Sequence, residues 1–256
     1  MRADVYLFSQ GAAKSRNRAR DLIDSGSVMI DGKPVKKASE EIDENTEHEI
    51  KIENTEKYVS RGGLKLESAL DAFRIDVTGF SALDIGASTG GFTDCLLKRG
   101  AKSCVAVDSG HGQLATSLLS DPRVVSYEKY NARELSPNII PEGADIVVMD
   151  VSFISQTLII ENIPQILREN GVFISLIKPQ FEAGRSAVGK GGIVHSKNDR
   201  KAAVLRVTDH AAKVGLFCTG LIVSPIKGGD GNTEYLAIFK RKGEPLSHES
   251  IARIVI

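Results

Sequence analysis

The sequence SALDIGASTGGFTDCLLKRGAKSCVAVD, residues 81–108, contains the clearest evidence for the fold of this chain. Residues 81–85 predict a buried strand that runs into a glycine-rich turn, and residues 92–99 predict the helix that follows. Residues 104–107 predict a second strand, which ends at Asp108. Strand, turn, helix and strand in this order are typical of a parallel sheet with helices on both faces, so we expect an α/β domain.

The spacing of the glycines narrows the ligand expected for this domain. A glycine-rich turn between the first strand and the first helix lets the backbone approach a nucleotide, and an acid such as Asp108, 22 residues after Gly86, can accept both ribose hydroxyls. The glycines follow the pattern GxxxGG, so the close pair of GxGxxG that seats a pyrophosphate is missing. The pattern disfavours a dinucleotide and favours an adenosyl ligand without phosphate; a domain that binds no nucleotide is the alternative.

Two charged residues are expected at the same edge of the sheet as the glycine turn. Residues 145–149 predict a strand that stops at Asp150, and residues 172–177 predict another that stops at Lys178. Residues 161–169 between them predict a crossover helix. Since open α/β sheets bind ligands at the carboxyl ends of their parallel strands, both side chains are candidates for the site.

An acid and a second lysine are expected at this edge. Residues 216–223 and 235–240 predict strands whose connection is short enough to require antiparallel pairing, so Glu234 starts its strand where the parallel strands end. Residues 64–74 have the apolar spacing of an amphipathic helix, and Lys65 lies in its first turn. Taken alone, this lysine is more typical of a solvated surface.

The N-terminal part of the chain differs, because its charges are separated along the sequence. Residues 1–37 carry eight basic and four acidic residues, a net charge of +4, whereas residues 38–56 carry eight acids and one lysine, a net charge of −7. The helical spacing of Val5, Phe8 and Ala12 predicts a first helix. A small module with a basic face and an acidic back is therefore expected.

The remaining elements of this module follow from local signals. Residues 16–24 predict a second helix with Ser15 as its N-cap. Asp31 and Gly32 form the dipeptide that a tight hairpin turn prefers, and residues 50–52 alternate as a strand does. Two helices followed by a small antiparallel ribbon are expected.

The composition excludes several kinds of protein. With 256 residues, 41% of them hydrophobic and 26% charged, the chain is neither disordered nor fibrous. The three cysteines and five histidines show no spacing typical of a disulfide framework or a metal site. No run approaches the roughly 18 apolar residues of a membrane-spanning helix, and the N-terminus lacks the apolar core of a secretory signal. We expect a cytoplasmic protein with no metal and no membrane partner; its oligomeric state is left open.

In order and residue type, residues 3–52 resemble the S4 RNA-binding module. In that family the second helix and the following turn contact the RNA backbone, so the resemblance implies the same here; a solvated basic helix is the alternative.

The glycine-rich segment 180–195 suits a mobile basic lid that orders on RNA, and a disordered loop is its alternative. The candidate RNA-binding residues are Lys14, Arg16, Arg18, Arg20, Arg61, Arg185 and Lys190.

The four charged residues of the sheet edge also resemble a known set. Lys65, Asp150, Lys178 and Glu234 have the order and placement of the K-D-K-E tetrad of RNA 2′-O-methyltransferases. A ribose hydroxyl is a poor nucleophile until it loses its proton, so methyl transfer requires a base. We expect Lys178 to be that base and Asp150 to orient it, while Lys65 and Glu234 fix the ribose and the local charge.

Longer motifs extend the resemblance to essentially the whole chain. LDIGASTGGFTD at 83–94 resembles motif I of class I S-adenosylmethionine-dependent methyltransferases. RGGLKLE at 61–67, VMDVSFIS at 148–155, IKPQFE at 177–182 and NTEYL at 232–236 resemble the TlyA family. Members of this family join an S4 module to an FtsJ-like methyltransferase domain, are often labelled hemolysins, and 2′-O-methylate cytidine in ribosomal RNA.

The resemblance implies a domain organisation and a partner. We expect an S4-like α+β domain at residues 1–56, a linker at 57–63, and a Rossmann-like class I methyltransferase domain at 64–256, whose mostly parallel α/β sheet has an antiparallel last strand. The implied partner is ribosomal RNA or a ribosomal subunit. A non-catalytic RNA-binding factor and a membrane-acting cytolysin are the alternative functions.

The implied cofactor is S-adenosylmethionine, with Asp84 near its methionine end. FtsJ proteins usually have proline and tryptophan where this chain has Thr89 and Phe92, so the resemblance is to TlyA-like members, and substrate assignment by analogy with other FtsJ proteins is weakened. The candidate cofactor-binding residues are Asp84, Gly86, Ser88, Thr89, Gly90, Gly91, Phe92, Asp108, Asn131 and Asp150.

Overall fold

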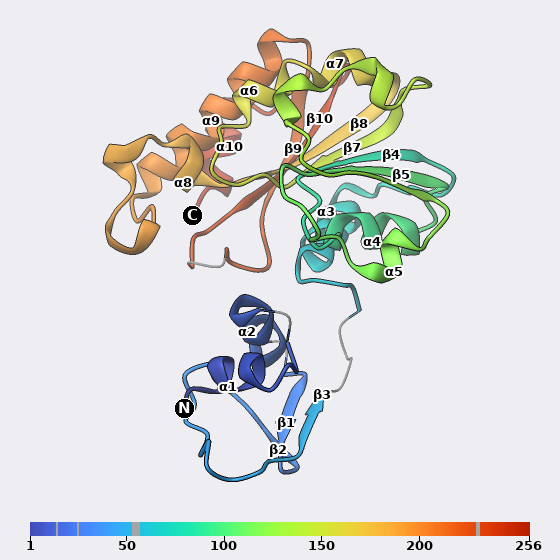
Figure 1. Ribbon diagram of the computed structural model, residues 1–256. Helices are drawn as coiled ribbons and strands as arrows, with labels where there is room; N and C mark the ends of the chain where they lie inside the picture. Colours follow the sequence, from blue (N-terminus) through green and yellow to red (C-terminus); the bar gives the residue numbers. More distant parts are fainter. Residues whose placement is uncertain (14, 25, 53–56, 229–230) are drawn as a thin grey trace. The chain divides into compact units, whose positions relative to one another are not determined.

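The computed structural model describes residues 1–13, 15–24, 26–52, 57–228 and 231–256 of the chain (Figure 1). The chain divides into two compact units, Met1–Arg61 and Gly62–Ile256. Each unit has its own cluster of buried hydrophobic side chains. The two units are described separately below.

The first unit combines two helices with a small antiparallel sheet, as predicted. Strand β1 lies in the centre of this sheet and pairs with β2 on one side and with β3 on the other. The elements are α1 (Ala3–Ser9), α2 (Arg16–Asp24), β1 (Val28–Ile30), β2 (Lys33–Pro34) and β3 (Ile50–Ile52).

Local chemistry explains the boundaries of these elements. The Ser15 hydroxyl accepts a hydrogen bond of 3.1 Å from the Arg18 backbone N–H, so Ser15 caps the start of α2 as expected. Asp31 and Gly32 have φ angles of 50° and 72°, the left-handed conformation that a two-residue hairpin turn between β1 and β2 requires.

The predicted first helix is confirmed as α1, but two of the three residues that indicated it do not belong to its buried face. Phe8 is 48% exposed, and Ala12 lies beyond the end of α1. The apolar side chains that α1 buries are those of Ala3, Tyr6 and Leu7, at i, i+3 and i+4, and Asp4 is buried beside them. Because α1 has only seven residues, its packing face is short, and Ala12 packs against the same buried cluster from beyond the helix end.

The second unit is built on a seven-stranded sheet in the order β6-β5-β4-β7-β8-β10-β9. Strands β4 to β8 are parallel, and β10 runs antiparallel between β8 and β9. A mostly parallel sheet with an antiparallel last strand was predicted and is confirmed. The strands are β4 (Ser81–Ile85), β5 (Ser103–Val107), β6 (Val124–Tyr127), β7 (Ala144–Met149), β8 (Leu167–Ile177), β9 (Phe217–Val223) and β10 (Tyr235–Lys240).

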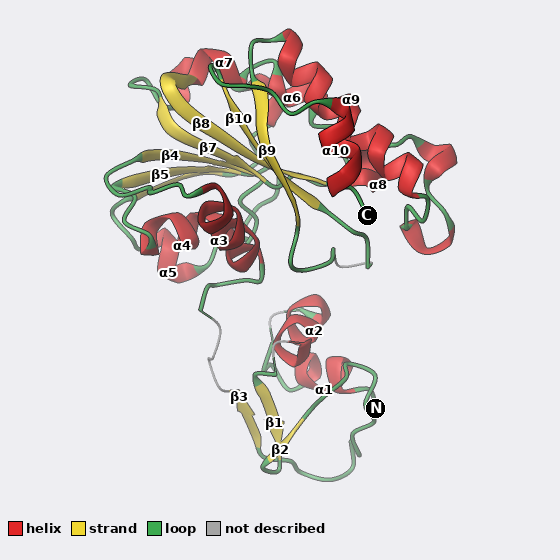
Figure 2. Ribbon diagram, turned by 180° about the vertical axis from the view of Figure 1, so that it is seen from behind, coloured by secondary structure: helices red, strands yellow, loops and turns green. Residues whose placement is uncertain are grey.

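Helices cover both faces of this sheet (Figure 2). Helices α3, α4 and α5 lie on one face, and α6, α7, α9 and α10 lie on the other. The helices are α3 (Gly62–Phe73), α4 (Gly91–Lys98), α5 (Thr116–Leu119), α6 (Thr157–Ile160), α7 (Ile163–Ile166), α8 (Pro179–Glu182), α9 (Lys197–Lys213) and α10 (His248–Ile254).

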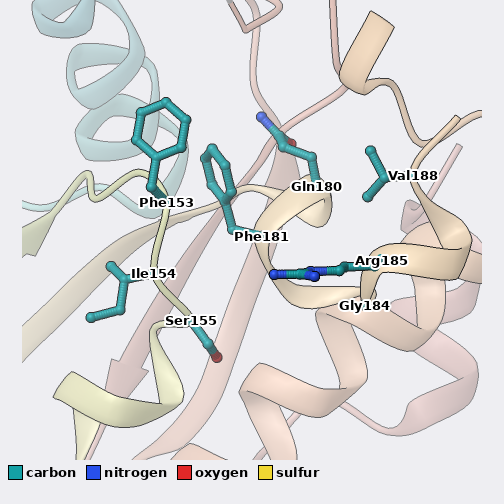
Figure 3. A pocket seen from close by; sticks show the side chains of 8 residues that line it. All are labelled: Phe153, Ile154, Ser155, Gln180, Phe181, Gly184, Arg185 and Val188. Atoms are coloured by element: carbon teal, nitrogen blue, oxygen red, sulfur yellow. The ribbon is translucent and has the colours of Figure 1, made fainter. Parts of the chain in front are cut away.

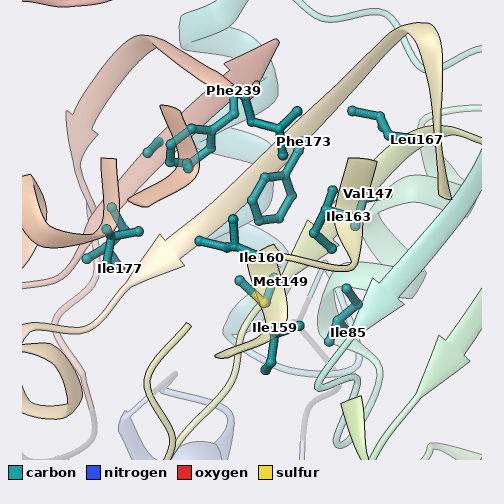
Figure 4. Packing of buried hydrophobic residues seen from close by; sticks show 14 of the residues in the cluster. Ile85, Val147, Met149, Ile159, Ile160, Ile163, Leu167, Phe173, Ile177 and Phe239 are labelled. Carbon is teal, nitrogen blue, oxygen red and sulfur yellow. The ribbon is translucent and has the colours of Figure 1, made fainter. Parts of the chain in front are cut away.

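Apolar packing fixes the central strands. The rings of Phe173 on β8 and Phe239 on β10 stack with their centroids 5.2 Å apart. Ile159, Ile160 and Ile163 of α6 and α7 belong to the same buried cluster (Figure 4). Burying side chains of this size stabilises a fold by about 1.5–3 kcal/mol each, so the strands that carry the site are held rigidly.

The predicted crossover helix at residues 161–169 was wrong. The connection between β7 and β8 contains two short helices, and β8 already begins at Leu167. Pro164 stands in the first turn of α7, where its missing N–H is tolerated, but it prevents one continuous helix from Thr157. The residues at the start of β8 are polar, so the sequence pattern did not predict this part of the strand.

Candidate active site

Two partly buried ion pairs join the four tetrad residues two by two. The Lys65 Nζ lies 2.6 Å from Glu234 Oε2, and the Lys178 Nζ lies 2.6 Å from Asp150 Oδ1. The lysine side chains are only 11% and 12% exposed, so each ammonium faces its carboxylate with little water around it. The structure thus brings the four residues together as two lysine–carboxylate pairs.

The strand register explains why both pairs lie at one edge of the sheet. Tyr235 is opposite Ile177 in the antiparallel ladder, so Glu234 and Lys178, the next residues along each strand, reach the same end. Asp150 directly follows β7, the parallel neighbour of β8. Because all three residues flank paired strand ends, small movements of surface loops leave their backbone positions unchanged.

One further contact and the following helix hold Lys178 in place. Its Nζ donates a hydrogen bond of 2.8 Å to the Ser152 hydroxyl, two residues after Asp150. Pro179 directly follows Lys178 and begins α8. The amine is therefore placed by both the β7 end and the β8 end, and no sequence pattern predicted the contact with Ser152.

The glycine turn after β4 requires its glycines. Gly86 has a φ angle of 83°, and a Cβ atom there would lie 2.5 Å from the backbone oxygen of Asp150. Gly90 has a φ angle of 95°, and a Cβ there would overlap the side chain of Leu118. A side chain at Gly86 would push apart the β4 and β7 ends, and one at Gly90 would displace the Leu118 side chain.

Asp84, near the end of β4, is fully buried, and only one of its two carboxylate oxygens has hydrogen-bond partners among the described residues. Its Oδ2 accepts hydrogen bonds from the Thr93 N–H at 2.9 Å and the Thr93 hydroxyl at 2.6 Å. Its Oδ1 is buried and has no hydrogen-bond partner among the described residues. Burial, with the nearby charge of Asp150, raises the pKa of Asp84 to about 7. An unpaired buried acceptor of this kind is suited to a donor from a bound ligand.

Asp108, after β5, is held by backbone amides. Its two oxygens accept hydrogen bonds from the Ser88 N–H at 2.7 Å and the Gly110 N–H at 2.6 Å. Each carboxylate oxygen can accept more than one hydrogen bond, so capacity remains for two hydroxyl donors. The carboxylates of Asp84 and Asp108 on either side of the glycine turn fit an adenosyl ligand with an ammonium end and a ribose.

The other candidate cofactor residues differ in their surroundings. Thr89 is half-buried in the turn, whereas Gly91 and Phe92 are buried in the first turn of α4. The Asn131 side chain is engaged locally, because it accepts from the Arg133 N–H and donates to Glu134. Contact of these residues with a cofactor stays a prediction.

The candidate RNA-binding residues are distributed over both units of the chain. Lys14 lies outside the described residues. The Arg16 and Arg20 guanidiniums both approach the buried carboxylate of Asp4. Arg18 lies on the same helix, and Arg61 is the last residue of the first unit.

Arg185 and Lys190 are exposed on short 3-10 turns within the segment 180–195. Asn232 holds this segment, because it accepts from the Val194 N–H at 3.0 Å and donates to Gly192 O at 2.8 Å. The segment therefore has a defined fold next to the strand that carries Glu234, and its closure on RNA stays a prediction.

Phe153 lines a cavity close in sequence to Asp150, and sequence reasoning did not single it out. Its side chain is 91% exposed and its φ angle is 64°, a strained conformation for a residue with a Cβ. Its ring lies 5.2 Å from that of Phe181, and both rings line a cavity of about 480 Å³ that Arg185 also reaches (Figure 3). Only a motif, and no periodicity, could have indicated it, since nothing in its neighbours predicts a positive φ.

Glu182 is a second missed residue. It is 1% exposed, and its carboxylate accepts hydrogen bonds from the Ser155 hydroxyl at 2.6 Å and the Gln156 N–H at 2.7 Å. Burial raises the pKa of this carboxyl. Glu182 thereby joins the segment that follows Asp150 to the helix that follows Lys178.

The described residues contain no group of three or more histidine, cysteine, aspartate or glutamate side chains suited to a metal ion. Within the same ranges, no helix combines the length and apolar character that a membrane crossing requires.

The parallel sheet, the glycine turn and the strand-end tetrad define the class of FtsJ-like methyltransferases. The FtsJ-like methyltransferase family model matches residues 58–241, and the S4 domain model matches residues 1–48. Within this class, the chain belongs to the TlyA family, as its motifs suggested.

Individual relatives match over most of their length. The chain is 44% identical to the 16S/23S rRNA (cytidine-2′-O)-methyltransferase TlyA of Mycobacterium tuberculosis, over 91% of this chain and 87% of that protein. It is also 44% identical to Hemolysin A of Brachyspira hyodysenteriae, over 93% and 99% of the two chains. A solved structure of a hemolysin-labelled protein from Streptococcus thermophilus is 41% identical, covers 100% of this chain and 94% of its own, and has a TM-score of 0.79.

Proposed function

We propose that this protein transfers a methyl group from S-adenosylmethionine to the 2′-hydroxyl of a cytidine ribose in ribosomal RNA. The observation that carries the proposal is the set of two partly buried ion pairs, Lys178 with Asp150 and Lys65 with Glu234, at the sheet edge that holds the glycine turn. The name of the M. tuberculosis relative supports cytidine as the target. Work on ribosomal RNA implies a cytoplasmic location and a ribosomal RNA or subunit as partner.

The cofactor would be held by residues around the glycine turn. Asp108 would accept the two ribose hydroxyls, and the unpaired Oδ1 of Asp84 would accept a donor at the methionine end. Gly86 and Gly90 leave room for the backbone to approach the ligand. When bound, S-adenosylmethionine supplies a methyl group on a sulfonium, which is a strong electrophile.

Lys178 is the proposed base. Its amine, once neutral, accepts the proton of the 2′-hydroxyl, and Asp150 and Ser152 hold the nitrogen in position for this transfer. Lys65, fixed by Glu234, supplies a positive charge that stabilises the developing alkoxide and holds the ribose. In this arrangement the two carboxylates orient the lysine amines. The Lys178 amine accepts the proton, and the Lys65 ammonium stabilises the alkoxide.

The charge distribution along the chain supports assigning RNA binding and catalysis to different domains. Residues 1–56 are proposed as the S4-like RNA-binding domain, 57–63 as the linker and 64–256 as the catalytic domain. Phosphate contacts from the basic face of the first domain would supply affinity without reading bases. Positional specificity then comes from the shape of the RNA.

Single-turnover transfer of tritiated methyl groups to ribosomal RNA tests the proposal. Lys178→Ala should reduce the rate by about 10² to 10⁴-fold with cofactor affinity nearly unchanged, because only proton transfer is lost. Lys102→Ala, which removes an exposed lysine before β5, is the control and should keep the wild-type rate. Wild-type protein that binds ribosomal RNA but incorporates no label would show a non-catalytic RNA-binding factor instead.

The target is tested in cells. Ribose methylation mapped on ribosomal RNA from cells with and without the gene should differ at one or more cytidines. Unchanged maps would refute the proposed substrate. Leakage of liposomes treated with purified protein and no cofactor would favour a cytolysin.

A further inference from the structure

One carboxylate in the first unit is surrounded by arginines. The Asp4 side chain is fully buried in the first turn of α1. Arg2 donates to both of its oxygens, from Nε at 2.9 Å and from Nη2 at 3.2 Å. Arg16 and Arg20, one turn apart on α2, place their Nη2 atoms 3.5 Å and 3.4 Å from Asp4 Oδ2. Three guanidiniums therefore converge on a single carboxylate.

The charges of this cluster do not cancel. Three guanidiniums against one carboxylate leave a net charge of +2. The three arginine side chains stay 45%, 53% and 48% exposed, whereas the carboxylate is hidden. Each guanidinium has five N–H donors, and the contacts to Asp4 use only one or two of them. The cluster thus presents free donors and positive charge to solvent and keeps its negative charge inside.

The buried carboxylate also decides where the guanidiniums lie. Long arginine side chains at a surface are flexible, and three like charges at close range repel each other. A shared carboxylate offsets this repulsion and fixes the planes of the guanidiniums before a ligand arrives. Because the guanidiniums are already ordered before a ligand binds, binding costs less side-chain entropy. The pKa of Asp4 is lowered to about 2 by Arg2, so the carboxylate stays charged at any physiological pH.

We propose that Asp4 is a positioning residue for RNA binding, which holds Arg2, Arg16 and Arg20 as one preformed site for backbone phosphates. This inference rests on the proposed function, since it assumes that the first unit binds RNA. It adds Arg2 and an acidic residue to the RNA-binding surface. An acid at an RNA-binding surface is expected to weaken affinity if only charge matters, so the proposal makes the opposite prediction.

The experiment compares two variants that remove one negative charge each from the full-length protein. Asp4→Asn keeps the size of the side chain but loses the anchor for the guanidiniums. Glu44→Gln removes an exposed acid of the same unit and serves as the control. Affinity for protein-free ribosomal RNA is measured by filter binding at several salt concentrations between about 50 and 200 mM.

Asp4→Asn should bind RNA about five- to tenfold more weakly than wild type, whereas Glu44→Gln should bind equally or slightly more tightly. Equal or tighter binding by Asp4→Asn would overturn the proposal and leave the proposed function standing. Wild-type protein without salt-dependent RNA binding would overturn both.

A triple variant separates positioning from a general loss of structure. In a background of Arg2→Gln, Arg16→Gln and Arg20→Gln, Asp4→Asn should weaken RNA binding no further, because the groups it positions are gone. A further loss of the same size in this background would mean that Asp4 only supports the fold, and would refute the positioning role.

Discussion

The Lys178 Nζ lies 2.6 Å from Asp150 Oδ1 at the ends of neighbouring parallel strands, while the equivalent pair of Lys65 and Glu234 joins a helix to an antiparallel strand. Each lysine thus has its own carboxylate. Because the two pairs are separate, mutation can remove one ion pair while the other stays intact.

Glu234→Gln should destabilise the protein and abolish methylation. Glu234 is 2% exposed, and its loss of charge leaves the buried Lys65 ammonium without a partner, which costs about 3–5 kcal/mol. The double variant Lys65→Met/Glu234→Leu replaces the pair by apolar side chains and should recover most of this stability. It should remain inactive, since the positive charge near the ribose is missing.

Denaturant unfolding followed by circular dichroism, together with single-turnover methylation, checks both parts. An active double variant would show that this ion pair is only structural.

Gly86→Ala should damage cofactor binding through the backbone. The added Cβ would meet the Asp150 carbonyl oxygen at 2.5 Å, a contact that only a shift of the β4 or β7 end can relieve. Gly79→Ala is a matched control, because Gly79 also has a positive φ angle, 76°, but open space around its Cβ position. The control should lose about 1 kcal/mol from strain alone and keep cofactor affinity. Isothermal titration with S-adenosylmethionine and thermal unfolding of both variants distinguish the two effects.

Three of the four tetrad positions can be predicted from sequence, because the ends of apolar strands are recognisable in it. Stops at Asp150 and Lys178 after apolar runs, and the short connection before Glu234, place three side chains at one edge without any structure. The division into two ion pairs was not predictable, since it depends on side-chain conformations.

Other features were hidden for different reasons. An acid such as Asp4 in a first helical turn is normally solvated, so its burial among arginines depends on how α1 and α2 pack. The positive φ of Phe153 is set by the tertiary structure around it. The early start of β8 at Leu167 was missed because polar residues there do not alternate.

Asp84→Asn should stabilise the protein in a pH-dependent way. The pKa of Asp84 is about 7 in the folded protein against 3.8 ordinarily, so the folded state binds the extra proton between these values. The stability that this proton provides is fully present below about pH 4 and is lost as the pH rises through 7. Asparagine has no charge to desolvate, so the variant should gain on the order of a few kcal/mol over wild type at pH 8 and almost nothing at pH 4.

The measurement is urea unfolding without cofactor at both pH values. A gain that is equal at pH 4 and pH 8 would contradict the raised pKa. The variant should also bind S-adenosylmethionine more weakly, because the carboxylate that we propose as an acceptor for the ligand is gone.

Glu182→Gln should slow methylation with little effect on cofactor affinity. Glu182 accepts hydrogen bonds from Ser155 and from the Gln156 N–H, and so ties the segment after Asp150 to the helix after Lys178. A carboxamide has one acceptor oxygen, so one of these hydrogen bonds is lost and the two strand ends are held less firmly. A fall of about tenfold in single-turnover rate is expected, as for a small displacement of a catalytic group. Glu169→Gln, an exposed acid on β8, is the control, and an equal rate in the two variants would show that this link does not position the base.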